Sequence, residues 1–169
     1  MPRPKTPKLP VNKTLLSEVL QRVSNAKTKA EKVNLLHEYK SPALTKVLLC
    51  NFAKSIRFTF PEGKTPYTES DQPKGINHQM LYREHKVLEK FIVKDIAPGV
   101  TVYGCSGDTR PRIQSLKKEA MWIQLLESLH QDEADLLDLV KDKRLTDNYK
   151  ITRQNVIDAF PELGLQNEK

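Results

Sequence analysis

Apolar residues recur at helical spacing along most of the chain. Between residues 13 and 25 they fall one, three and four positions apart, which predicts a helix with one apolar face. Residues 28–39 and 41–52 continue this periodicity. Thr28 and Glu31 have the spacing of a capping box at the start of the second segment, and a Ser-Pro pair opens the third. The pattern therefore predicts three successive helices before residue 53.

The middle of the chain mixes short apolar segments with stretches rich in proline and glycine. Residues 55–60 alternate polar and apolar positions, as a short strand does. A fourth helix is expected to begin at a cap at Asn77 and to carry its apolar face as far as Ile92. Residues 98–112 hold β-branched positions among glycines and prolines, so we expect an irregular segment with a short strand pair.

The last third of the chain returns to helical periodicity. The apolar face of a long helix is predicted to consist of Leu116, Ala120, Ile123, Leu126 and Leu129, with Trp122 beside it. Asp132 is expected to cap the next helix, on which the leucines point inward and four acids cover an exposed start: Asp132, Glu133, Asp135 and Asp138. A short helix opened by Ile151 and Thr152 is expected to stop at Pro161.

These elements predict a mainly α, single-domain helical bundle of about six or seven helices. Residues 1–12 contain four prolines among basic residues, so we expect a flexible basic arm there. The helical domain is assigned to residues 13–163, with irregular insertions at about 61–76 and 97–114. Residues 164–169 are assigned to a C-terminal tail.

Composition narrows the class of protein. The chain has 169 residues, of which 38% are hydrophobic and 29% are charged, a balance that suits one compact domain. No stretch approaches the roughly 18 apolar residues of a membrane span, and the first residues lack the apolar segment of a signal peptide. We therefore expect a soluble, intracellular protein without membrane contact. The two cysteines, Cys50 and Cys105, are expected to be reduced thiols.

Positive charge is concentrated near the beginning of the chain. The net charge of the protein is +7, but residues 1–64 alone carry 13 Lys and Arg against 4 Asp and Glu. Residues 119–169 carry 6 basic against 11 acidic residues. A basic front suggests a face for polyanions, because phosphates relieve the repulsion among clustered cations. A solvated cationic surface without a ligand would have the same composition.

Two groups of basic residues are candidates for binding phosphate. Lys27, Lys29 and Lys32 cluster at the junction of the first two predicted helices, where amides at a helix start would face the same anion. Arg110 and Arg112 follow a glycine-containing loop whose amides could hold a phosphate. The loop lacks the Gly-Lys-Ser/Thr ending of a nucleotide-binding loop, and a tight turn is the alternative.

Catalytic chemistry is not indicated by the sequence. His78 and His85 could share a helix face, but two imidazoles without a third ligand make a poor zinc site. His37 and His130 lie at predicted helix ends, where histidine commonly caps carbonyl groups. We therefore expect neither an enzyme nor a metal or other cofactor.

Two segments of the chain, quoted as they stand, carry a resemblance to a known family. The first block includes VSNAKTKAEKVNLL at 23–36 and SPALTKVLL at 41–49. The second runs from LLDLV at 136–140 to ITRQNVIDAFPEL at 151–163. Together they resemble the N-terminal helical DNA-binding domain of phage-type ATP-dependent DNA ligases. The whole chain also resembles a family of proteins, of unassigned function, from tailed phages of marine bacteria.

The ligase resemblance implies binding to duplex DNA across the minor groove, with helix starts and basic side chains on the phosphates and little base readout. The matching positions are Lys27, Lys29, Arg144, Thr152 and Arg153. The Lys-x-Asp-Gly motif that carries the nucleotidyl group in ligases is absent from the sequence, so no adenylated intermediate is expected.

The sequence therefore favours a non-catalytic phage protein that grips double-stranded DNA. The alternative is a protein-interaction or virion structural component that uses the ligase-like bundle as a scaffold. Its phage or host partner would dock on the acidic C-terminal third or on the proline-rich arm. The resemblance places the protein in the host cytoplasm, and association with the virion is left open.

Overall fold

The computed structural model describes residues 14–60, 62–69, 79–103 and 115–165. The helices in these residues are α1 (Leu16–Asn25), α2 (Lys29–Glu38), α3 (Pro42–Phe52), α4 (Leu81–Glu84), α5 (Ser115–Ser128), α6 (Gln131–Lys141) and α7 (Arg153–Ala159). The strands are β1 (Ile56–Phe58), β2 (Ile92–Ala97) and β3 (Val100–Tyr103). Short 3₁₀ helices are η1 (His85–Lys90), η2 (Leu145–Asp147) and η3 (Pro161–Leu163). The expected mainly helical fold is confirmed.

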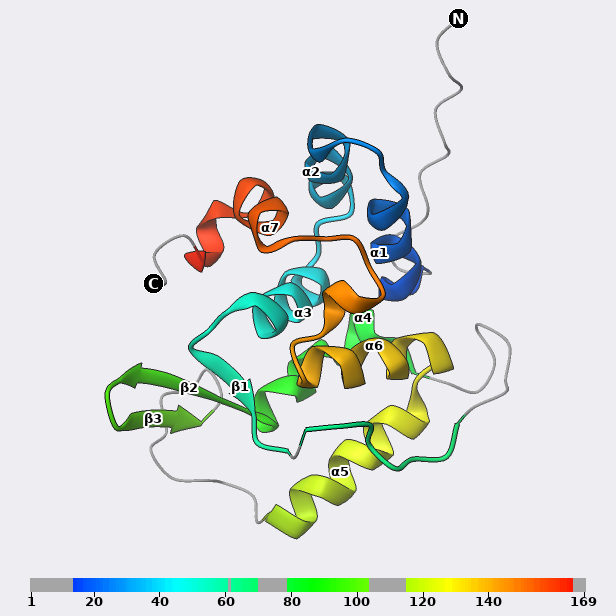
Figure 1. Ribbon diagram of the computed structural model, residues 1–169. Helices are drawn as coiled ribbons and strands as arrows, with labels where there is room; N and C mark the ends of the chain where they lie inside the picture. The colour runs from blue at the N-terminus through cyan, green and yellow to red at the C-terminus, as the bar shows by residue number, and fades with distance from the viewer. Residues whose placement is uncertain (1–13, 61, 70–78, 104–114, 166–169) are drawn as a thin grey trace, which may run out of the picture.

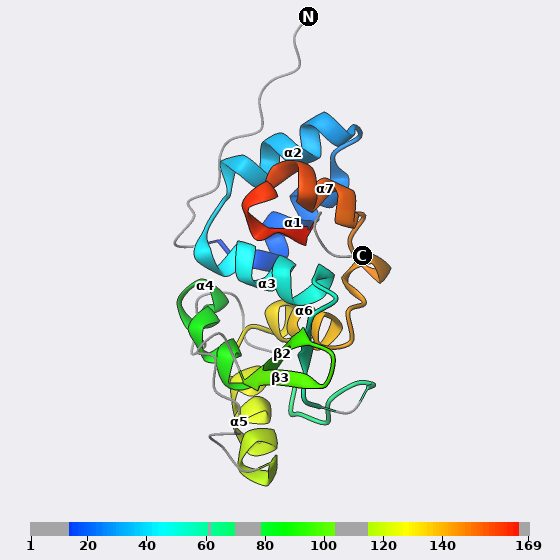
Figure 2. The same ribbon diagram turned by 90° about the vertical axis from the view of Figure 1, so that its left-hand side faces the viewer.

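The described helices are arranged in tiers around a shared core. Helices α1, α2 and α7 lie at one end, α3, α4 and α6 lie in the middle, and α5 and the sheet lie at the other end (Figures 1 and 2). Helix α3 contacts α4, α6, η1 and β1, so it joins the middle tier to the sheet, and α6 joins the middle tier to α1. The buried apolar residues of all tiers form one cluster, and its largest fully buried side chains are Trp122, Tyr39, Phe91 and Phe160.

The second and third helices begin where their caps predict. The hydroxyl of Ser41 accepts a hydrogen bond from the amide of Leu44 at 3.1 Å, and that of Thr28 accepts from the amide of Glu31 at 3.2 Å. The second predicted hydrogen bond of the capping box, from the Thr28 amide to the Glu31 carboxylate, is wrong. The carboxylate of Glu31 accepts from the amide of Lys27 at 3.1 Å, one residue before the cap. It therefore ties the turn between α1 and α2 to the start of α2.

The long fourth helix expected between Asn77 and Ile92 is also wrong. Helix α4 has only four residues, η1 ends at Lys90, and Ile92 begins β2. Asn77 lies outside the described residues. The strand replaces the helix because β2 is paired on both of its edges, and these ladder hydrogen bonds override the local helical spacing.

Three antiparallel strands form the sheet, in the order β1-β2-β3. Phe58 of β1 lies opposite Ile92 of β2, and Val93 of β2 lies opposite Tyr103 of β3. The expected strand within residues 55–60 and the expected strand pair are both present, joined into one sheet. Gly99 has a φ of 75° in the turn between β2 and β3, a left-handed conformation that favours glycine.

Helix α5 and the residue after it bury Leu126 and Leu129, as the apolar spacing predicts, but the start of the predicted face is turned to solvent. Trp122, Leu125 and Leu126 are buried, whereas Ala120 is exposed and Leu116 is 83% exposed. The indole ring packs against Phe58, Phe60 and Phe91. Burial of this large ring sets the rotation of the helix, since it removes more apolar surface from water than the leucine and alanine would.

The acids of α6 do not all cover an exposed surface, contrary to expectation. Glu133 is fully buried, and its two carboxylate oxygens accept hydrogen bonds from the amides of Leu16 and Leu81, each at 3.1 Å. One side chain thus caps the starts of both α1 and α4. Asp138 is also buried and accepts from the amide and the hydroxyl of Thr65. Buried carboxylates of this kind require such donors.

Helices α6 and α7 begin at different kinds of cap. Asp132 was expected to cap α6, but the cap is His130. The Nδ1 atom of His130 accepts a hydrogen bond from the Asp132 amide at 3.1 Å. At the start of α7 the side chains of Thr152 and Asn155 each accept from the amide of the other residue, at 3.2 and 3.0 Å. The helix ends before Pro161, as predicted.

The described part of the first insertion, residues 62–69, is bound along α6. Gly63 donates its amide to Asp142 at 3.1 Å, and the hydroxyl of Tyr67 donates to Asp135 at 2.8 Å. With the Thr65 contacts, two acids of α6 and Asp142 directly after it fix this loop at three points. The indole of Trp122 donates to the Thr65 hydroxyl at 3.2 Å, so the loop is also anchored to α5.

Candidate nucleic-acid interface

Helices α2 and α7 pack side by side and run in the same direction (Figure 2). In the first turn of α2, the ammonium group of Lys32 donates to the carbonyl oxygen of Lys150, just before α7 begins. Near the end of α2, the ring of His37 bonds to the carbonyl oxygen of Ala159, the last residue of α7. The two helices therefore begin at the same end of the pair.

Lysines from two distant segments gather where α2 and α7 begin. Lys27, Lys29 and Lys150 are exposed, and Lys32 is half-buried. Lys32 and Lys150 are 118 positions apart in sequence but are joined by their hydrogen bond. We call Lys27, Lys29, Lys32 and Lys150 the basic edge. The expected cluster of the three earlier lysines is thus extended by a fourth that the sequence analysis did not select.

The backbone at the start of α2 adds donors to the basic edge. The amide of Lys32 makes the first α-helical hydrogen bond, to the carbonyl of Thr28 at 3.1 Å. The amides of Lys29 and Ala30 precede this bond in the first turn. Amides in this position carry the partial positive charge of the helix start. Backbone and side chains therefore favour a negative group at the same place.

Two residues implied by the ligase resemblance have structural contacts instead. The hydroxyl of Thr152 caps α7 through its bond with Asn155. The guanidinium of Arg153, which is half-buried, donates to the carbonyl oxygens of Phe52 and Leu165, the latter at 2.8 Å. Arg153 thus joins the end of α3 to the C-terminal segment.

The remaining candidate arginines differ in position. Arg144 is exposed and donates from Nε to Asp147 at 2.8 Å, in an ion pair whose side chains are 60% and 47% exposed. It lies in the segment that leads to Lys150. Arg110 and Arg112 lie outside the described residues. The structure therefore brings together Lys27, Lys29 and Lys32, and leaves Arg144 on the surface of the neighbouring segment.

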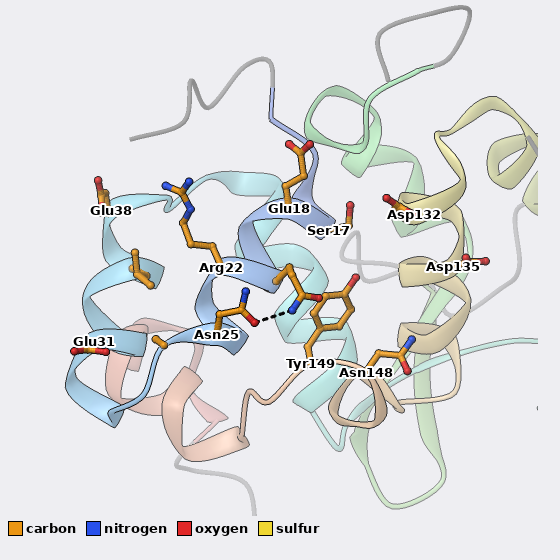
Figure 3. Close-up of a pocket in the computed structure, with 13 residues that line it drawn as sticks. Ser17, Glu18, Arg22, Asn25, Glu31, Glu38, Asp132, Asp135, Asn148 and Tyr149 are labelled. Carbon is orange, nitrogen blue, oxygen red and sulfur yellow. Dashed lines mark hydrogen bonds between the residues drawn. The ribbon is translucent and has the colours of Figure 1, made fainter. Parts of the chain in front are cut away.

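A cavity of about 1110 Å³ lies beside the basic edge, between α1, α2, the start of α6 and Tyr149 (Figure 3). Its lining carries five carboxylates and one guanidinium: Glu18, Glu31, Glu38, Asp132, Asp135 and Arg22. We call it the acidic cavity. Sequence analysis missed it, although the spacing of Glu31, Leu35 and Glu38 places all three on one side of α2.

The negative charge of the acidic cavity affects the pKa of Tyr149, which lines it. The pKa of Tyr149 is raised to about 12, first by burial and then by the negative charges of Asp132, Asp135 and Glu133. Helix α2 therefore separates two surfaces of opposite sign. Lys29 and Lys32 belong to the basic edge, and the glutamates of the same helix line the cavity.

No helix within the described ranges is long and apolar enough to cross a membrane. In the same ranges no three side chains of His, Cys, Asp or Glu are grouped as ligands of a metal ion. His85 bonds through Nδ1 to the carbonyl oxygen of Tyr82 at 3.0 Å, and His78 lies outside the described residues.

A family of unknown function, DUF6433, matches residues 19–147, which is well over half of the chain. The protein belongs to DUF6433. No curated protein and no solved structure matches the chain.

The DUF6433 match extends from α1 to η2. It includes the three earlier lysines of the basic edge and also Arg144, but it ends before Lys150, Thr152 and Arg153. The part of the basic edge that precedes α7 is therefore outside the region matched by DUF6433. Four of the five carboxylates of the acidic cavity lie within the matched region, and Glu18 lies just before it.

Proposed function

We propose that the protein binds duplex DNA without catalysis, through the phosphate backbone and with little preference for sequence. The basic edge and Arg144 make the contacts. The parallel packing of α2 and α7 gives this proposal its main support, because it brings Lys150 beside Lys32 at the end where both helices begin.

The chemistry of the basic edge suits phosphates better than bases. Lysine presents a compact, mobile charge that contacts phosphate oxygens without a fixed orientation. Each such contact releases counterions condensed on the DNA, and this release is the main source of sequence-independent affinity. Arg144 can turn from its exposed partner Asp147 to a phosphate at small cost, since surface ion pairs are weak.

The resemblance to the ligase domain adds independent support from sequence. Its two blocks contain both segments of the basic edge or border directly on them, at residues 23–36 and 151–163. Without the Lys-x-Asp-Gly motif, the proposal is limited to binding. It places the protein on phage or host DNA in the host cytoplasm, and packaging into the virion is compatible with it.

Salt-dependent binding tests the proposal directly. Fluorescence anisotropy with a labelled random-sequence duplex is measured over a series of salt concentrations for the wild type and the triple variant Lys27→Ala, Lys29→Ala, Lys150→Ala. The matched control removes three exposed lysines on η1 and α5, by Lys86→Ala, Lys90→Ala and Lys117→Ala. Both triple variants change the net charge equally.

The triple variant of the basic edge should bind more weakly and should lose about 0.9 from the logarithmic salt slope for each contact removed. The control should keep the slope of the wild type. Equal slopes for the wild type and the first variant would show that the basic edge does not contact phosphates. Equal losses in both triple variants would show a diffuse effect of net charge.

A second candidate function is binding to a protein partner. The acidic cavity favours it, because a hollow lined by carboxylates repels DNA and attracts cations. The proline-rich arm, the other expected docking segment, lies outside the described residues.

A further inference from the structure

The acidic cavity contains an unusual polar group at Ser17. This residue of α1 is 5% exposed and lines the cavity. Among the buried side-chain nitrogen and oxygen atoms of the described residues, its hydroxyl oxygen is the one without a hydrogen-bond partner. Buried polar groups in folded proteins are nearly always hydrogen-bonded, so an exception points to a group that is supplied from outside.

The surroundings of Ser17 define what that group can be. Figure 3 shows the Ser17 side chain between Glu18 and Asp132, with Tyr149 below it. A serine hydroxyl in a cavity whose walls carry five carboxylates is best satisfied by a donor that carries positive charge, because a cation also pairs with the carboxylates. An anionic or purely apolar ligand would leave the carboxylates facing it without compensation.

The size of the acidic cavity distinguishes among cations. Its volume of about 1110 Å³ lies beyond the roughly 300–1,000 Å³ of typical small-molecule sites. The described carboxylates are not grouped tightly enough to hold a metal ion. They are spread over α1, α2 and α6, at separate points along the walls. Such a spread matches several positive side chains on one extended segment of polypeptide.

The lining also provides apolar contacts for the stems of such side chains. Leu35, Ala26 and the ring of Tyr149 line the cavity together with the acids. Lysine and arginine have long aliphatic stems that pack on apolar surface while their charged ends reach carboxylates. A free polyamine has the charges but no backbone to contact Gln21, Asn25 and Asn148, whose amides also line the cavity.

We propose that the acidic cavity binds a lysine- or arginine-rich segment of a partner protein, with the Ser17 hydroxyl accepting a hydrogen bond from one of its cationic groups. The carboxylates of the three walls pair with the other cations. This binding does not depend on the DNA-binding proposal, since α2 separates the two surfaces. A partner in the cavity leaves the basic edge open.

The probe is a fluorescein-labelled oligolysine peptide, titrated with the full chain at low salt. The test variant is Glu31→Gln with Glu38→Gln, which removes two charges from the α2 wall and keeps an acceptor for the Lys27 amide. The matched control is Glu62→Gln with Glu119→Gln, two exposed acids outside the cavity lining. We expect the test variant to bind the peptide about tenfold more weakly and the control to bind like the wild type.

Ser17→Ala tests the hydroxyl separately. Because that hydroxyl has no partner in the protein, alanine should leave the thermal midpoint unchanged or raise it, while peptide affinity falls severalfold. A merely structural serine would give the opposite result, a lower midpoint with unchanged affinity, and would remove Ser17 from the proposal.

Three results overturn the proposal. The first is unchanged peptide affinity in the Glu31→Gln, Glu38→Gln variant, and the second is an equal loss in the control variant. The third is competition by spermidine at the same charge concentration with equal strength, which would assign the cavity to small polyamines. DNA binding measured on the same variant should stay at the wild-type level or rise, so failure of one proposal is distinguishable from failure of the other.

Discussion

Two groups of basic side chains lie at opposite ends of helices: one at the start of α2, the other at the end of α3. Lys27 and Lys29 stand at the start of α2 and are exposed. Lys143 and Arg153 donate to carbonyl oxygens at the end of α3 and are half-buried. All four are cations, yet of these only Lys143 and Arg153 donate to backbone carbonyl oxygens of another element.

The direction of the helix explains the difference. The end of a helix carries partial negative charge and unpaired carbonyl groups, so cations there stabilise the fold. The start carries partial positive charge, so lysines there lower stability unless an anion is bound. The carbonyl groups at the end of α3 therefore distinguish Lys143 and Arg153, which hold the fold together, from Lys27 and Lys29, which lie at the start of α2.

The largest effect is expected from Arg153→Ala. It removes charged donors from two backbone carbonyls and should lower the free energy of unfolding by about 2–3 kcal/mol, measured by urea denaturation. Arg144→Ala is the control, because its exposed pair with Asp147 should contribute less than about 1 kcal/mol. If the two variants were equally stable, the structural role of Arg153 would be refuted.

A smaller effect is expected at Lys143, which donates to Ala53 and has a φ of 58°. Lys143→Ala loses the hydrogen bond and keeps the left-handed backbone, so the free energy of unfolding should fall by about 1–2 kcal/mol. Lys143→Gly loses the same bond but adopts this backbone without strain, and should be roughly 1 kcal/mol more stable than the alanine variant. The reverse order of the two variants in urea would contradict this account.

The smallest effect has the opposite sign. Lys27→Ala and Lys29→Ala should each raise the free energy of unfolding by about 0.3–1 kcal/mol at low salt, because each removes a cation from the start of α2. Lys29→Gln should reproduce the gain, since it removes the charge and keeps most of the side chain. Lys90→Ala, at the end of η1, should show no gain. A loss of stability in the Lys27 and Lys29 variants would remove the contrast between the two groups.

Features set by neighbouring residues could be predicted from the sequence. The caps at Ser41 and Thr152, the stop at Pro161 and the strand at β1 each depend on a few adjacent positions. The hydroxyls of Ser41 and Thr152 accept from amides three residues further along, so the information is contained in the local sequence. The mainly helical fold follows from the same local signals.

Features that depend on distant partners could not be predicted from the sequence. The spacing before Ile92 is helical, but pairing with Phe58 of β1 makes this residue part of a strand. Glu133 looks like a surface acid at a helix start, and only the docking of α1 and α4 shows why it is buried. Trp122 sets the rotation of α5 through aromatic partners from the sheet and the segment that follows β1.

The same division applies to the candidate site. Lys27, Lys29 and Lys32 are close in sequence and were selected as a cluster. Lys150 joins them only because α7 packs parallel to α2, and the sequence contains no sign of that packing. The acidic cavity combines walls from three helices, so the glutamates of α2 alone could not reveal it.

The double cap formed by Glu133 makes distant segments cooperative. Its carboxylate is stabilised by hydrogen bonds from the amides at the starts of α1 and α4, so loss of either helix removes a donor and weakens the interaction with the other. Fraying of the chain near Leu16 is thereby transmitted across the bundle to Leu81. We therefore expect the segments that begin α1 and α4 to lose their structure together when this carboxylate loses either partner.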